Sequence, residues 1–336
     1  MILRSIAAAL ALSVQATSAF AAAPSAYKVA GSISGPDGGW DYASVDPATR
    51  RLYVAHGTAI TAIDLASGTV TAALAPASRP HQVLPIPGSG LILETDGGTG
   101  NARLIDAKTG AESARIKVGD NPDAAIWDAA RHRVIVMNAK SGSVMLVDPA
   151  SAKVVGTIAL AEGLEYAALD KRGRLYVNDE DRNQIAVVDV DQQKLVRWID
   201  LKGCEGPTGM AYAPTADRIV SACGNGVVAV VDPNAGRMVG TIAIGKGPDA
   251  VIGDARRQRL FVPSGAAGTL AVLAETPGRI SLIQTVTTEV SARTGAVDPI
   301  DGRVYLPAAT MLPPTQPGAR RQPAPGSFHL IVVAPQ

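Results

Sequence analysis

Several features are scarce or missing in this sequence of 336 residues. Beyond the N-terminus no segment has about 18 consecutive apolar residues, so we expect no membrane-spanning helix there. Basic and acidic residues nearly balance, 31 against 30, which argues against nucleic-acid binding because that usually needs a basic excess. The motifs of a nucleophile elbow, a phosphate loop, an HExxH zinc site and an EF-hand are also missing. The local signatures of common enzymes are therefore not found.

The N-terminal residues have the order of an export signal. Arg4 provides a positive charge, Ile6 to Val14 form a short apolar run, and residues 19–21 have the small-x-small pattern of a cleavage site. We expect cleavage after Ala21, with a buried N-terminal helix as the alternative. The mature chain, residues 22–336, is then expected to be a single domain in the periplasm or outside the cell.

Four short β-prone runs recur as a unit along the rest of the chain. An aspartate closes the third run of successive units at spacings of 41 to 43 residues: Asp64, Asp106, Asp148, Asp189 and Asp232. An arginine opens the second run of six units: Arg51, Arg133, Arg174, Arg218, Arg259 and Arg303. A period near 42 residues with four strands per unit is typical of the blades of a β-propeller.

Seven units fit the chain, and the last one lacks a strand. It begins near Arg293 and ends with the run Phe328 to Val333, whereas Tyr27 to Ile33 precedes the first full unit. We therefore predict an all-β fold, a seven-bladed β-propeller of four-stranded antiparallel blades, with the ring closed by the N-terminal strand. Closure would remove exposed sheet edges. A solenoid is the alternative, but it would need polar caps that the terminal units lack.

Three of the second runs resemble a known family. Arg51-Leu-Tyr-Val-Ala55, Arg174-Leu-Tyr-Val-Asn178 and Arg259-Leu-Phe-Val-Pro263 are similar to the repeats of YVTN-repeat propellers, which include the YncE-like proteins. The resemblance covers essentially the whole mature chain and implies the same fold. It implies no single function, because the superfamily includes binding proteins, lactone-opening enzymes, lyases and redox-partner subunits.

Polar residues of different kinds occupy one face of the predicted ring, where propellers usually bind ligands. At the starts of the first strands these are Asp41, His81, Asp123, Glu165, Thr208, Asp249 and Arg293. At the ends of the second strands they are His56, Asn138, Asp179 and Ser264. We expect these residues to line a funnel that holds a small molecule, a peptide or a partner protein. Solvated strand ends without a ligand are the alternative.

The charged residues of this face indicate two kinds of chemistry. A cluster of imidazole and carboxylate groups on adjacent units could bind a divalent metal or perform acid–base chemistry: His56, His81, Asp41 and Asp123. The same groups could also simply hydrogen-bond one another. Arg293, the one basic residue at the first-strand starts, would either bind a ligand carboxylate or phosphate or pair with Glu289 or Asp249.

Two further features lie on the same face. Cys204 and Cys223 map close together, and in an exported protein we expect them to form a disulfide. The segment Met311 to Gly326 holds five prolines and no apolar periodicity. It is expected to be either a disordered loop or a lid that brings Arg320 and Arg321 to the acidic ring.

Two functions remain open at this point. One is a binding or scaffold protein that holds its ligand in the funnel. The other is an enzyme that uses metal-assisted or acid–base chemistry, such as a lactonase or a lyase. We favour binding, because no catalytic motif supports the enzyme, and a divalent metal is the single cofactor that the residues suggest.

Overall fold

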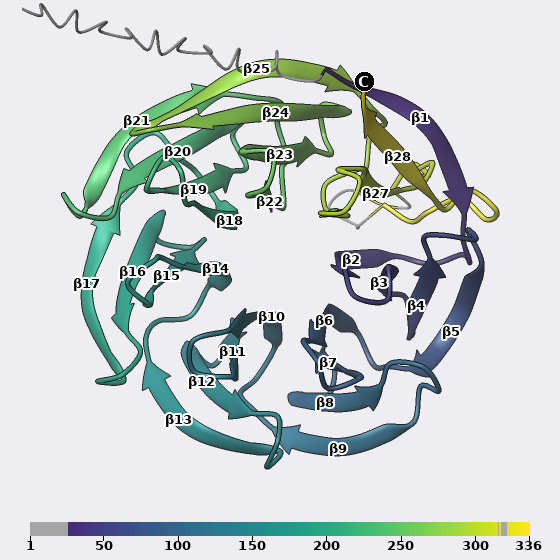
Figure 1. Cartoon of the computed structure of the whole chain (residues 1–336), viewed down its shortest axis with the longest axis horizontal. Helices are drawn as coiled ribbons and strands as arrows, with labels where there is room; N and C mark the ends of the chain where they lie inside the picture. The colour runs from purple at the N-terminus through teal and green to yellow at the C-terminus, as the bar shows by residue number, and fades with distance from the viewer. Residues whose placement is uncertain (1–25, 315, 317–320) are drawn as a thin grey trace, which may run out of the picture.

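The computed structural model describes residues 26–314, 316 and 321–336, and the predicted signal peptide lies outside them. All regular structure in this part of the chain is β, with 28 strands in seven four-stranded antiparallel sheets. Figure 1 shows the sheets arranged as blades around a central opening, which confirms the predicted seven-bladed propeller. Within these residues we find no helix with the length and apolar character that crossing a membrane requires.

Each of the first six blades uses four consecutive strands, ordered from the centre outward. Blades 1 to 3 are β2 (Trp40–Asp46), β3 (Arg51–His56), β4 (Ala59–Asp64), β5 (Val70–Pro76); β6 (Pro80–Ile86), β7 (Leu91–Asp96), β8 (Asn101–Asp106), β9 (Glu112–Lys117); and β10 (Pro122–Asp128), β11 (Arg133–Asn138), β12 (Ser143–Asp148), β13 (Lys153–Ala159). Blades 4 to 6 are β14 (Leu164–Leu169), β15 (Arg174–Asp179), β16 (Gln184–Asp189), β17 (Lys194–Asp200); β18 (Pro207–Ala213), β19 (Arg218–Cys223), β20 (Val227–Asp232), β21 (Arg237–Ala243); and β22 (Ile252–Asp254), β23 (Arg259–Ser264), β24 (Thr269–Thr276), β25 (Arg279–Thr287). Blade 7 combines β26 (Ala296–Val297), β27 (Val304–Ala308), β28 (His329–Pro335) and β1 (Tyr27–Ser34).

The repeated aspartate holds the turn between the third and fourth strands of a blade. The Asp64 carboxylate accepts hydrogen bonds from the backbone N–H groups of Ala66 and Ser67 at 2.9 and 2.8 Å. Asp106 holds its turn in the same way, accepting from the N–H groups two and three residues later. An aspartate side chain replaces a missing backbone partner in such turns, which explains why it recurs with the period of the blade.

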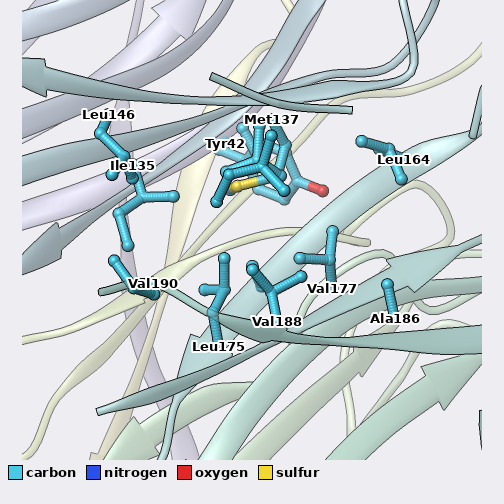
Figure 2. Packing of buried hydrophobic residues seen from close by; sticks show 14 residues of the cluster. Tyr42, Ile135, Met137, Leu146, Leu164, Leu175, Val177, Ala186, Val188 and Val190 are labelled. Atoms are coloured by element: carbon cyan, nitrogen blue, oxygen red, sulfur yellow. The ribbon is translucent and has the colours of Figure 1, made fainter. Parts of the chain in front are cut away.

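Blades pack on one another through strands that are apolar on both faces. Figure 2 shows the contact between blades 3 and 4, where Ile135 and Met137 of β11 lie near Leu175 and Val177 of β15. Tyr42 of blade 1 crosses the central opening to join this cluster. A strand buried between two neighbours must present apolar side chains in both directions, which the second strands do.

The N-terminal strand closes the ring. β1 pairs antiparallel with β28 from Tyr27 opposite Pro335 to Ser34 opposite His329, which confirms the predicted closure. Strand β1 also binds blade 6, because the side chain of Gln284 in β25 bonds both the N–H and the C=O of Tyr27 at 2.8 Å. Strand β1 is thereby held to both blade 6 and blade 7.

The two cysteines form the predicted disulfide. The bond joins Cys204, in the loop before β18, to Cys223, at the end of β19, with the Cα atoms 5.3 Å apart. Both cysteines are buried, and no free cysteine occurs in the described residues.

Candidate ligand-binding site

A cavity of about 620 Å³ lies at the face where the first strands begin. Six of the seven residues predicted at the first-strand starts line it, and each comes from a different blade: Asp41, His81, Asp123, Glu165, Asp249 and Arg293. The seventh, Thr208, instead donates a hydrogen bond to the carbonyl of Pro248 at 3.1 Å. The cavity is therefore built by almost the whole ring and by no single blade.

Irregularities in the inner strands position these side chains. In β10 the register against β11 shifts between Pro122 and Ala124, so that Asp123 has no partner across the sheet. The same shift occurs near the starts of β2, β6, β14 and β18. A β-bulge turns a side chain out of the regular alternation, and here it directs polar groups toward the central opening.

His81 connects two of the carboxylates. Its Nδ1 lies 2.7 Å from Asp41 Oδ2 and 3.3 Å from Asp123 Oδ1. Its Nε2 accepts a hydrogen bond from Nε of Arg79 at 3.2 Å, and Arg79 also binds the side chain of Asn121. Both nitrogens of the imidazole therefore have partners.

Arg293 balances a third carboxylate. Its Nε lies 2.9 Å from Asp249 Oδ2, and a second guanidinium nitrogen donates to the carbonyl of Trp40 at 2.9 Å. The guanidinium also lies 5.6 Å from the centre of the Trp40 ring. Of the two predicted roles, this geometry matches pairing with Asp249, while Glu289 bonds His329 instead.

Glu165 differs from the other carboxylates of the cavity. Among the described residues it has no hydrogen-bond or ion-pair partner, although it is only partly accessible. Tyr42, whose side chain is 4 % exposed, lies in the wall beside it, and its hydroxyl also has no partner there. Tyr42 also lines a second cavity of about 210 Å³ together with Tyr166, whose ring centre lies 5.1 Å from that of Tyr42.

The crowding of carboxylates changes their protonation. Burial raises the pKa of Asp123 to about 7, with the Asp41 charge adding to the rise and His81 opposing it. Burial raises the pKa of Asp249 to about 6 despite the neighbouring Arg293. Burial and the charges of Asp123 and Asp249 hold the pKa of Glu165 well above its usual range. Burial and neighbouring carboxylates both disfavour the ionised form, so these groups hold their protons more tightly than they would in water.

His81 responds in the opposite way. Burial lowers the pKa of His81, but its hydrogen bond to Asp41 and the charges of Asp123 and Asp41 outweigh burial, so the pKa is raised overall. Its proton belongs to a shared network with the two carboxylates.

The residues predicted at the ends of the second strands lie elsewhere. His56, Asn138, Asp179 and Ser264 are all buried, with at most 3 % of their surface exposed, and they form no part of the cavity wall. Asn138 accepts from the N–H of Gly119 at 3.0 Å, and Asp179 accepts from the N–H of Arg182 at 2.9 Å. A second strand is covered by strands on both sides and by the next blade, so its end bonds local loops.

Of the four predicted metal ligands, Asp41, His81 and Asp123 lie together and His56 lies apart from them. His56 Nδ1 lies 3.1 Å from the hydroxyl of Thr61, and its ring stacks on Phe328 with the centres 4.1 Å apart, away from His81 and Asp123. Burial lowers the pKa of His56 accordingly. In the described part of the chain no group of three or more His, Cys, Asp or Glu side chains has an arrangement that could hold a metal ion.

The sequence interpretation missed several residues of the wall. Tyr42, Arg79 and Asn121 line the cavity, and none was predicted. Arg79 and Asn121 have φ of 59° and 51°, a left-handed conformation that other blades give to glycine at the corresponding place, Gly163, Gly206 and Gly247. A non-glycine residue is uncommon in this conformation. Arginine and asparagine at a repeat position that is otherwise glycine were therefore the sequence feature that could have identified these two wall residues. Tyr42 had no local signal, because its neighbours in the wall come from other blades.

Part of the proline-rich segment lines the cavity. Met311 pairs with Pro323, and both line the cavity together with Arg321 and Gln322. The structure thus brings Arg321 to the cavity that the carboxylates line, whereas Arg320 lies outside the described part of the chain.

The comparisons with known proteins support the fold. No family model and no curated protein matches the chain. Among solved structures, the chain is similar to Kuenenia stuttgartiensis hydrazine synthase (TM-score 0.71, 14% identity, covering 82% of this chain and 94% of that one). It is also similar to a chain of the mitotic checkpoint complex (TM-score 0.75, 13% identity, 99% of each chain) and to virginiamycin B lyase from Staphylococcus aureus (TM-score 0.69, 13% identity, 92% and 99%). At such low identity these likenesses show the propeller fold alone.

Proposed function

We propose that this protein is an exported binding protein of the YVTN-repeat, YncE-like group that holds a small polar ligand in the cavity of about 620 Å³. The observation that carries the proposal is the convergence of charged groups from six blades on one cavity, where Glu165 has no partner in the described part of the chain. Keeping buried charges together without complete pairing costs stability, so a ligand that completes the pairing is the reason to retain them. A cavity of this size suits a small molecule or the end of a peptide.

The geometry favours binding over acid–base catalysis. The enzyme alternative, lactonase-like or lyase-like, would use the pair of His81 and Asp41, which lie 2.7 Å apart. However, the Nε2 lone pair that a general base needs already accepts a hydrogen bond from Arg79. One structural neighbour is a lyase by name, but at 13% identity this likeness supports the fold and no reaction.

The proposal also includes the cellular location of the protein and the class of its partner. A disulfide supports an oxidising compartment, in agreement with the export signal expected from the N-terminal sequence. We further propose that residues 22–336 form one domain after cleavage at Ala21. The near balance of charge speaks against a nucleic-acid partner.

A pair of glycine substitutions tests the proposal. Gly39 lines the cavity, and a Cβ added there meets no atom within 4 Å, so Gly39→Trp places a ring in the cavity without displacing a neighbour of its Cβ. Gly240, on the outer strand β21, is equally open and gives the matched control Gly240→Trp.

Native mass spectrometry of each protein from an exporting host is the measurement. We expect a co-purified small molecule, or one captured from a concentrated periplasmic extract, on the wild type and on Gly240→Trp but not on Gly39→Trp. Equal capture by all three proteins, or none by any, would overturn the proposal.

A further inference from the structure

We infer that the ligand carries a cationic nitrogen, such as a primary or secondary amine, and that this nitrogen lies beside Tyr42 between Asp123 and Glu165. The inference rests on the proposed function, because it names the chemical class that this same cavity takes. It depends on three observations: carboxylates in the cavity wall that lack a close basic partner, the unpartnered hydroxyl of the nearly buried Tyr42 beside them, and the absence of a metal-binding arrangement in the described residues.

The carboxylates that line the cavity are not all paired with a basic group. Asp249 is paired with Arg293 at 2.9 Å, and Asp41 is paired with His81 at 2.7 Å. Asp123 shares the same imidazole at the longer distance of 3.3 Å, and Glu165 has no partner among the described residues. One imidazole nitrogen, His81 Nδ1, therefore serves two carboxylates, while Glu165 has no partner among the described residues.

Among the described residues, the other basic groups of the wall form no ion pair with Asp123 or Glu165. Arg79 donates to His81 Nε2 and to the side chain of Asn121. Arg321 lies on the proline-rich segment, where it is exposed. A cation that enters the cavity would thus meet carboxylates that the protein's own cations leave unneutralised, and ion pairing inside a cavity is stronger than in water.

Tyr42 supplies the second, independent observation. Its side chain is 4 % exposed and lines the cavity, yet its hydroxyl has no hydrogen-bond partner in the described part of the chain. The charges of Asp249, Glu165, Asp123 and Asp41 all act on this hydroxyl, and together with burial, the largest cause, they raise the pKa of Tyr42 well above its usual range. The residue is almost fully buried and lines the cavity, so a group bound there can supply the partner that the described residues do not.

An ammonium group matches this set of acceptors. It has three N–H donors and no acceptor, and the site offers the carboxylates of Asp123 and Glu165 and the oxygen of Tyr42. A divalent metal would need its ligands gathered closely around one point, and no such group exists among the described residues. The acceptor groups beside Tyr42 therefore favour an organic cation over a divalent metal.

The cation must compete with protons. Asp123 and Asp249, with pKa values raised by burial to about 7 and about 6, and Glu165 bind protons near neutral pH when the cavity is empty. The other titratable or charged groups that face them are Asp41, Tyr42, Arg79, His81, Glu180, Arg293 and Arg321. Binding of the amine should release protons, and its affinity should fall as the pH drops from 8 to 6.

The test uses three sets of probes of matched shape on the full mature protein. The cations are n-butylamine, benzylamine and 1,4-diaminobutane; n-butanol and benzyl alcohol are the neutral controls, and butyrate is the anionic control. Isothermal titration calorimetry at pH 8, repeated in buffers with different ionisation enthalpies, gives the affinity and the number of protons released. The proteins are the wild type, Glu165→Gln, Asp123→Asn and Tyr42→Phe, with Glu205→Gln, an exposed carboxylate outside the cavity, as the matched control.

We expect at least one amine to bind with a stoichiometry near one and with proton release, while its alcohol shows no binding. The affinity should fall about ten-fold or more in Glu165→Gln and Asp123→Asn and remain unchanged in Glu205→Gln. Melting temperatures recorded in parallel establish that each variant is folded.

The alternative outcomes separate the two proposals. If the alcohols or butyrate bind and the cavity variants abolish that binding, the cation inference is overturned while the proposed function stands. Amine binding that is equal in all variants, or no amine binding at all, also overturns the inference. The proposed function itself fails only if the Gly39→Trp comparison detects no ligand in the cavity.

Discussion

The carboxylates of the cavity differ in what they contact. Asp249 and Asp41 have close basic partners, whereas Glu165 has none among the described residues and Asp123 only shares one. Burial without full pairing makes the ionised form of Glu165 and Asp123 costly in the empty protein. The residues that make this site useful for binding therefore make it less stable when it is empty, a common trade-off at functional sites.

We predict that Glu165→Gln and Asp123→Asn stabilise the empty protein at pH 8. The folded-state pKa of each carboxyl is raised above its unfolded value, so the folded protein retains a proton that the unfolded chain loses first. Stability contributed by these groups is present at low pH and is lost as the pH rises through their raised folded-state pKa, which for Asp123 is about 7.

An amide cannot ionise, so each substitution removes this pH-dependent loss of stability. At pH 8 each variant should gain about 1–2 kcal/mol in the free energy of unfolding, and near pH 4 the gain should vanish. Urea unfolding at the two pH values measures the difference. A variant that is less stable than the wild type at pH 8 would contradict the assignment of these groups.

At the scale of a single blade, an ion pair lies between two central strands. Glu94 of β7 is opposite Arg103 of β8, and their closest atoms are 2.7 Å apart. Both side chains are buried, at 0 % and 5 % exposure. Arg103 also donates to the carbonyl of Pro76 at 2.8 Å and so connects blade 2 to the end of β5 in blade 1.

Removing one partner of this pair should be costly. Glu94→Ala removes the closest partner of the buried Arg103 and leaves it with Glu112 at 3.3 Å and Asp96 at 4.0 Å, and we expect a loss of about 3 kcal/mol in the free energy of unfolding. The double variant Glu94→Leu with Arg103→Leu should recover most of that loss, because no unpaired charge remains. Glu112→Ala, which removes a partly exposed partner, should cost less than about 1 kcal/mol. Chemical denaturation of the four proteins measures these differences, and equal losses in Glu94→Ala and Glu112→Ala would refute the prediction.

The disulfide acts on a second element, the loop that leads into β18. It joins residues 19 apart, and the chain-entropy relation gives a loss of about 3 kcal/mol in the unfolding free energy when it is removed. We expect this loss in the double variant Cys204→Ala with Cys223→Ala, measured against the oxidised wild type. Alkylation followed by mass measurement under denaturing conditions should find no reactive thiol unless a reductant is added.

At the scale of the whole molecule, stability depends on closing the ring. The Tyr27 ring of β1 packs edge-on against Phe261 of blade 6 at 4.9 Å, and Tyr27 is buried. Across the joint between blades 1 and 7, Arg50 donates to Asp298 at 2.6 Å. These contacts connect parts of the chain that are far apart in sequence, so they form late and keep the edges covered.

We predict that Tyr27→Ala weakens this closure by about 3 kcal/mol, because a large buried ring is lost from a well-packed position. Val29→Ala, at a half-exposed position of the same strand, should change stability by less than about 0.5 kcal/mol. Thermal unfolding followed by circular dichroism gives both values. If the two substitutions had the same effect, β1 would not be held by Tyr27.

The fold could be predicted because its signal is local and repeated. The aspartate turns, the arginine at the start of the second strand and the doubly apolar strands each reflect an interaction within one blade or with its neighbour. Repetition of these patterns with one period therefore determined the number of blades and the strand that completes the last one.

The candidate site could be predicted only in part. The positions at the starts of the first strands were found because the repeat assigns them to one face. The ends of the second strands were assigned to the same face, but Asn138 and Asp179 bond nearby loops instead. The repeat assigns a polar residue to one face, but it does not show whether that residue bonds its own loop or lines a cavity. This difference depends on contacts that are not local in sequence.

By itself, the sequence determined the architecture of this protein, its closing strand and its disulfide, since each follows from patterns that recur or lie close along the chain. The tertiary structure alone decided which charges pair and which remain unpaired. Asp41 meets His81, Asp249 meets Arg293 and Glu165 meets no partner among the described residues. These groups belong to different blades, and their distances are fixed only when the ring is closed.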